Sequence, residues 1–224
     1  MSNMRRRRPE PPAGMPAVEH RPGMADEMLR ELAPLLAEEG INLDDPDGID
    51  APDMETLQRA LDRAVERQNL ARFTPLGVAR DRAATTLRLA VVAIVDGDTT
   101  EAAAVLDTAQ PESADNSVAT VAGCIGLALG LLDDWLDGHD TTAPDGLARN
   151  ARLPAGHWDG ERAAADILRL AGRHRAFRSL DSLIMHQGSL RLLYGCALAL
   201  TAALTAWSDH TGTPLPKLVH DAIG

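Results

Sequence analysis

The chain has 224 residues, a formal net charge of −11 and an aromatic content of only 3%. This negative charge argues against a general nucleic-acid-binding surface, because contacts with phosphates need a positive face. With so few aromatic side chains, the core must consist mainly of Ala, Leu and Val, which favours close packing of helices over a sheet sandwich. Lys217 is the only Lys, and we interpret this Arg bias as that of a high-GC bacterial genome. We therefore predict an all-α helical bundle.

The N-terminal 24 residues differ from the rest of the chain. They contain five Pro and the four consecutive arginines Arg5, Arg6, Arg7 and Arg8. Such a segment cannot bury enough apolar surface to offset the entropy of ordering, so we predict a disordered tail over residues 1–24. It has no apolar stretch typical of a signal peptide, which indicates a cytoplasmic protein. The arginines are candidate contacts for an anionic partner, and a nucleic acid would be bound only through this tail.

Apolar residues recur at helical spacing through most of the remaining chain. The predicted helices span residues 26–40, 53–71, 75–97, 99–109, 115–136, 159–172, 179–207 and 214–223. Gly40 is expected to end the first helix, Asp98 and Glu101 to form a capping box, and Gly188 to bend the seventh helix. We divide this part of the chain into a helical region (25–138), a long loop (139–158) and a C-terminal helical region (159–224).

A short motif occurs twice in the chain. A Gly-Cys pair at 123–124 precedes Trp135, and a second pair at 195–196 precedes Trp207, and in each case Trp is the eleventh residue after Cys. The chain has only two Cys and three Trp, so the match favours an internal duplication of a three-helix unit. The predicted repeats are residues 75–137 and 159–209. The alternative is chance, because Ala- and Leu-rich helices resemble one another and the aligned blocks need gaps.

Small residues form a stripe on both Cys-bearing helices. The first helix has Gly123, Gly126 and Gly130, and the second has Gly195 and Ala199. Each Gly inside a helix costs about 1 kcal/mol relative to Ala, so a stripe of them indicates close contact with another helix. We expect the two Cys-bearing helices to meet, within one chain or across the axis of a homodimer. This predicts an oligomeric module that works through contacts with itself or with another protein.

An acidic string, Asp133-Asp134-Trp135-Leu136-Asp137, ends the first Cys-bearing helix. Asp133 and Asp137 are one turn apart on one face and could hold magnesium for a diphosphate. The string resembles the first aspartate-rich motif of isoprenoid synthases, which are all-α enzymes. The resemblance implies a magnesium-dependent isoprenoid-diphosphate enzyme in which Asp133, Asp134 and Asp137 bind the metal. The alternative interpretation is a solvated acidic helix end without a ligand.

Other signals of chemistry are absent from the sequence. It has no phosphate loop, dinucleotide fingerprint, nucleophile elbow or HExxH motif. The two Cys fit neither a disulfide framework nor zinc spacing, so we expect buried reduced thiols. The longest apolar runs, 118–132 and 192–207, are shorter than the roughly 20 residues of a membrane-spanning helix, so no membrane contact is expected. The leading hypothesis is a protein-interaction module without catalytic residues or cofactor. The second is the isoprenoid-diphosphate enzyme, which alone would need magnesium. The third is a regulator that contacts nucleic acid through its N-terminal tail.

Overall fold

The structure is a computed structural model that describes residues 33–41, 54–110, 119–139, 152–154, 156, 160–171 and 176–223. For Met54, residues 135–139 and Ala171, only the backbone is described. The predicted tail and most of the predicted loop therefore lie outside the described residues. The chain divides into two units, residues 1–61 and 62–224, and the boundary falls inside helix α2 (Met54–Phe73).

The first unit has a small apolar cluster. Residues 33–38 are helical and are followed by a turn at Gly40 with φ of 81°, a left-handed conformation that glycine adopts without strain. The amide of Ile41 returns to the carbonyl oxygen of Leu36 at 2.9 Å, which closes the end of the helix. The prediction that Gly40 ends this helix is confirmed. The buried side chains are Leu36, Ile41 and Ala60, with Leu57 and Leu61 packed against them.

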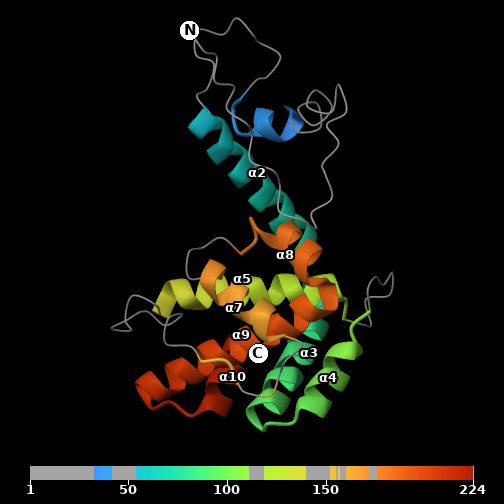
Figure 1. The fold of residues 1–224 in the computed structure, drawn as a ribbon, viewed down its shortest axis with the longest axis vertical. Helices are drawn as coiled ribbons and strands as arrows, with labels where there is room; N and C mark the ends of the chain where they lie inside the picture. Colours follow the sequence, from blue (N-terminus) through green and yellow to red (C-terminus); the bar gives the residue numbers. More distant parts are fainter. Residues whose placement is uncertain are drawn as a thin grey trace, which may run out of the picture. The chain divides into compact units, whose positions relative to one another are not determined.

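The second unit contains the C-terminal part of α2 and further helices (Figure 1). These are α3 (Gly77–Val95), α4 (Thr99–Asp107), α5 (Val121–His139), α7 (Glu161–Ala171), α8 (Leu180–Gln187), α9 (Ser189–Thr211) and α10 (Leu215–Ile223). In the described part of the chain, the one extended pairing is an isolated parallel bridge between Gln110 and Thr120. The prediction of an all-α fold is confirmed.

Helix α9 is the centre of the second unit. It contacts α3, α4, α5, α7, α8 and α10, and α5 in turn packs against α3, α7 and α9. The buried side chains around it are mainly Ala, Leu, Ile and Val, with Phe73 and Phe177 the buried aromatic residues among those described. Small side chains allow helix axes to approach closely, so a core with few aromatic rings can still be densely packed.

Local chemistry explains several helix boundaries. The side chain of Asp98 accepts a hydrogen bond from the amide of Glu101 at 2.8 Å, which confirms Asp98 as the cap of α4. The amide of Asp98 donates to the carbonyl oxygen of Ala93 at 2.9 Å, so the return bond of the predicted capping box is not formed. The hydroxyl of Thr120 accepts from the amide of Gly123 at 3.0 Å and caps α5. The predicted start of this helix at residue 115 is therefore wrong at residues 119 and 120, where the chain forms the bridge and the cap. At Gly188, with φ of 79°, the predicted bend is a full break between α8 and α9.

Helix α9 has 23 residues, which is longer than the apolar run seen in the sequence. By length and composition it is the one described helix able to cross a membrane, yet 67% of its most apolar window is buried inside the protein. The prediction that the apolar segment is too short to span a membrane is therefore wrong for this helix. Its burial is what the central helix of a folded bundle shows, because its apolar side chains already contact neighbouring helices.

Each predicted repeat contains three described helices. The first holds α3, α4 and α5, and the second holds α7, α8 and α9, with a short helix in the middle of each. Cys124 and Cys196 are both fully buried, on α5 and α9 respectively. The side chain of Trp135 lies outside the described residues, and the duplication stays a prediction.

Candidate functional site

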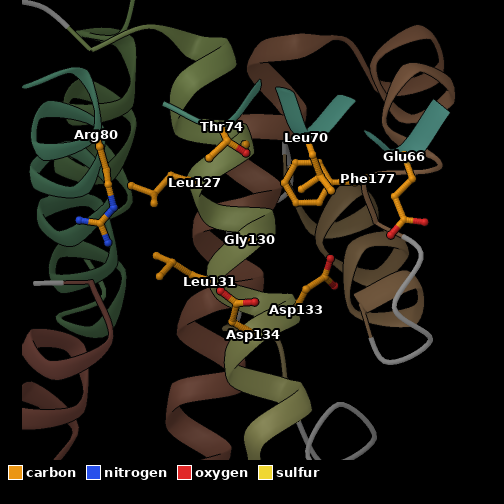
Figure 2. A pocket seen from close by; sticks show the side chains of 11 residues that line it. Glu66, Leu70, Thr74, Arg80, Leu127, Gly130, Leu131, Asp133, Asp134 and Phe177 are labelled. Carbon is orange, nitrogen blue, oxygen red and sulfur yellow. The ribbon is translucent and has the colours of Figure 1, made fainter. Parts of the chain in front are cut away.

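A cleft of about 400 Å³ lies over α5 in the second unit (Figure 2). We call it the α5 cleft. This volume is within the range of about 300 to 1,000 Å³ that is common for small-molecule sites. Its lining residues are Glu66, Leu70, Thr74, Arg80, Gly126, Leu127, Gly130, Leu131, Asp133, Asp134 and Phe177.

Two glycines of α5 line the cleft in different ways. A Cβ atom added to Gly126 would lie 2.0 Å from the carbonyl oxygen of Phe73, so the end of α2 needs a glycine there. A Cβ atom added to Gly130 would have only Cζ of Phe177 nearby, at 4.0 Å, which is an ordinary contact distance. Gly126 therefore permits a close approach of two chain segments, whereas Gly130 leaves space open in the cleft.

Side chains of α2 hold the opposite wall of the cleft in place. The buried Asn69 donates from Nδ2 to the carbonyl oxygen of Phe177 at 2.8 Å. The next residue, Arg178, bonds to Asp62 and to Glu66 with N to O distances of 3.2 Å each. Because the three side chains of this ion-pair group are only about one-third exposed or less, it is better shielded than a surface pair, and it fixes the ring of Phe177 beside α5.

The acidic residues of α5 differ in their exposure. Asp133 is half-buried, with its Oδ1 atom shielded from solvent, whereas Asp134 is exposed. Both side chains line the α5 cleft. The side chain of Asp137, the third predicted metal ligand, lies outside the described residues. Among those that are described, no group of three or more His, Cys, Asp or Glu is arranged to hold a metal ion, and the metal assignment stays a prediction.

The other predicted packing residues have neighbours from the same chain. Gly123 lies beside Pro75 and donates its amide to Thr120. On α9, a Cβ atom added to Gly195 would lie 2.5 Å from Cβ of Ala163, so this glycine accommodates α7. Ala199 is fully buried. The two Cys-bearing helices do contact each other, but Gly123, Gly126 and Gly195 meet other parts of the chain.

The two thiols are buried and free, as predicted. Burial raises the pKa of Cys124 from its ordinary value of 9.0 to about 12. The pKa of Cys196 is raised further, first by burial and then by the neighbouring thiol of Cys124. Because only the thiolate is a good nucleophile, neither side chain is suited to nucleophilic chemistry at neutral pH.

Asn69, Phe177 and Arg178 shape the cleft, and none of them is among the residues predicted from the sequence. A signal existed for one of them: Asn69 follows Leu61 and Val65 at intervals of four, which places a polar amide on an apolar helix face. The tail arginines Arg5 to Arg8 lie outside the described residues.

The chain matches no protein-family model, no curated protein and no solved structure.

Proposed function

We propose that this protein is a cytoplasmic helical interaction module that forms a homodimer through α3. An exposed apolar face of α3 supports the proposal. Val78, Leu89 and Val92 are 56%, 52% and 43% exposed. Residues 11 and 14 positions apart lie on nearly the same side of a helix, so these three form one stripe, together with the exposed Arg82 and Thr85. Aliphatic side chains gathered on one helix face are typical of an interaction surface.

The charges on this face are complementary to a second copy of itself. Arg82 and Asp96 each lie seven residues from Leu89, on opposite sides of it. In an antiparallel pair of α3 helices with the twofold axis at Leu89, Arg82 therefore faces Asp96 of the partner subunit, and the reverse contact follows by symmetry. Neither residue forms an ion pair with another residue that the structure describes. A homodimer would bury the aliphatic stripe and form two ion pairs between Arg82 of one subunit and Asp96 of the other.

The free thiols of Cys124 and Cys196 fit the proposed location, because a reducing compartment keeps cysteines unpaired. Their deep burial also fits a structural rather than a catalytic role.

Light scattering coupled to size-exclusion chromatography tests the dimer. The parent is expected to run as a dimer and Leu89→Glu as a monomer, because two carboxylates would meet at the axis. Met185→Glu is the matched control: this residue is 81% exposed on α8, away from the stripe, and the variant should stay dimeric. Arg82→Glu should weaken the dimer, and adding Asp96→Arg should restore it. A parent that is monomeric at every concentration, or equal behaviour of the two Glu variants, would overturn the proposal.

A further inference from the structure

Two of the four charged side chains that line the α5 cleft already interact with other parts of the protein. Glu66 forms an ion pair with Arg178, with an N to O distance of 3.2 Å. Asp133 also has an interaction of its own within the chain. Because a nearby partner offsets the attraction of a carboxylate for a further charge, neither residue is expected to select a ligand by its charge.

Arg80 and Asp134 are the other two charged residues of the lining. Both are exposed, and among the residues that the structure describes neither has an ion-pair or hydrogen-bond partner. A simple cation would be opposed by Arg80, and a simple anion by Asp134 and by the net charge of −11 of the whole chain. A small zwitterion has no net charge and can pair with both residues.

Helix geometry places these two groups beside one apolar surface. Leu131 and Asp134 follow Leu127 by four and seven residues, so the three lie on one face of α5. On α3, the fully buried Leu87 follows Arg80 by seven residues, so Arg80 belongs to the side of α3 that packs into the protein. Figure 2 shows Arg80 on the same side of α5 as Leu127 and Leu131. Arg80 is therefore exposed at the point where the cleft leaves the packed side of α3 uncovered.

The floor of the cleft has room for an apolar ligand body. A Cβ atom added to Gly130 would meet only Cζ of Phe177, at 4.0 Å, so the space over α5 is open at this position. Apolar side chains lie on both sides of it in Figure 2: Leu127 and Leu131 on one side, Leu70 and Phe177 on the other. A ligand body over Gly130 can contact both sides, and binding is favoured because apolar surface is removed from water.

We infer that the α5 cleft binds an apolar amino acid in its zwitterionic form. The carboxylate of the ligand pairs with Arg80, its ammonium group pairs with Asp134, and its side chain lies over Gly130. The volume of about 400 Å³ is near the lower end of the range for small-molecule sites, which fits a ligand of this size. The site is separate from the proposed dimer face, because Arg80 is nine residues from Leu89 and lies on the opposite side of α3.

Three probes with the same benzyl side chain test the charge preference: phenylalanine, phenylalanine amide and N-acetylphenylalanine. The amide keeps the ammonium group and lacks the carboxylate, whereas the acetylated compound keeps the carboxylate and lacks the ammonium group. Calorimetric titrations of the full chain are made at about pH 6, well below the pKa of an α-amino group. Phenylalanine is expected to bind at least about tenfold more tightly than either analogue, because only the zwitterion pairs with both Arg80 and Asp134.

Two charge variants assign the two ends of the ligand. Arg80→Gln should weaken the binding of phenylalanine by about tenfold, and should not weaken that of the amide, which has no carboxylate. Asp134→Asn should also weaken phenylalanine by about tenfold, and should not weaken N-acetylphenylalanine, which has no ammonium group. The matched controls are Arg88→Gln on α3 and Asp107→Asn at the end of α4, since neither residue lines the cleft. Both control variants should bind phenylalanine like the parent.

The apolar part of the site is tested at Gly130. Gly130→Leu fills the open space over α5 with little steric conflict. It should abolish the binding of phenylalanine while the melting temperature stays close to that of the parent. Free glycine, which has both charged groups and no apolar body, should bind the parent much more weakly than phenylalanine.

Three results would overturn the inference. If either analogue binds the parent as tightly as phenylalanine, the protein recognises only one end of the ligand. If phenylalanine binds Gly130→Leu as it binds the parent, the probe lies elsewhere on the protein. If phenylalanine does not bind a parent protein that is dimeric, this site is removed and the proposed interaction function stays intact.

Discussion

Helices α5 and α9 carry the same Gly-Cys pair and are both apolar, yet their small residues serve different purposes. On α9, the space beside Gly195 is occupied by α7, whose Ala163 lies where a side chain of residue 195 would be. On α5, the space beside Gly126 is occupied by the end of α2, but Gly130 borders open space in the cleft. A glycine in an apolar helix can therefore mark either a close contact or a cavity. Only the three-dimensional neighbours of each position decide which.

The largest effect is expected for Gly126→Leu. Its Cβ would lie 2.0 Å from the carbonyl oxygen of Phe73, and backbone atoms yield less readily than flexible side chains. We expect a loss of about 3 kcal/mol in the free energy of unfolding, measured in urea. Gly130→Leu, one turn away on the same helix, is the control and should cost little. If the two variants unfold at the same urea concentration, Gly126 is not in closer contact with the rest of the chain than Gly130, and the expectation is contradicted.

A smaller loss is expected for Gly195→Ala. The added methyl would lie 2.5 Å from Cβ of Ala163 and 2.8 Å from the amide nitrogen of Ala164, so α7 and α9 must separate slightly. After the gain of about 1 kcal/mol in helix propensity, we expect a net loss of about 2 kcal/mol. Adding Ala163→Gly should recover part of it in a double-mutant cycle. Strict additivity of the two changes would argue against the close contact of α7 with α9.

At the cysteines, α5 and α9 are expected to behave alike. Below pH 9.0 the thiols are protonated in both the folded and the unfolded chain, so they add no pH dependence. Between pH 9.0 and about 12 the unfolded chain releases the proton of Cys124 while the folded protein keeps it. The free energy of unfolding should then fall as pH rises, by about 1.4 kcal/mol per pH unit for each thiol. Denaturation of the parent and of Cys124→Ala across this window measures the difference, and identical slopes would be the contrary result.

The smallest effect, and the one of opposite sign, is expected for Gly130→Ala. The added methyl would meet only Cζ of Phe177 at 4.0 Å, so the variant gains helix propensity without steric conflict. We expect the protein to become more stable by up to about 1 kcal/mol. A loss of stability in thermal and urea unfolding would mean that the space beside Gly130 is not open.

Local patterns predicted the helices well and the cleft poorly. The spacing of apolar residues predicts the all-α fold, and the cap at Asp98 and the stop at Gly40 follow from their own neighbours in sequence. The start of α5 was misplaced because an apolar run does not reveal that Thr120 forms a bridge with Gln110. Such pairings depend on tertiary structure, which overrides local propensity.

For the candidate site, the sequence singled out Asp133, Asp134, Gly126 and Gly130, all of which line the α5 cleft. It did not single out Phe177, because an aromatic residue far along the chain carries no local sign of its neighbours. It also could not separate Gly126 from Gly130, since the two differ only in whether Phe73 approaches them.

The hydrogen bond from Asn69 to Phe177 and the ion pairs of Arg178 have a consequence for the order in which the protein assembles. They join positions 108 to 116 residues apart. Contacts of such high sequence separation form late, because the entropy of closing the intervening chain must be paid before they stabilise anything. Neighbouring helices such as α3 and α4 can pair as soon as they leave the ribosome. A nascent chain that still lacks residues 176–179 has no Phe177 wall, so the cleft is completed only when most of the protein has been synthesised.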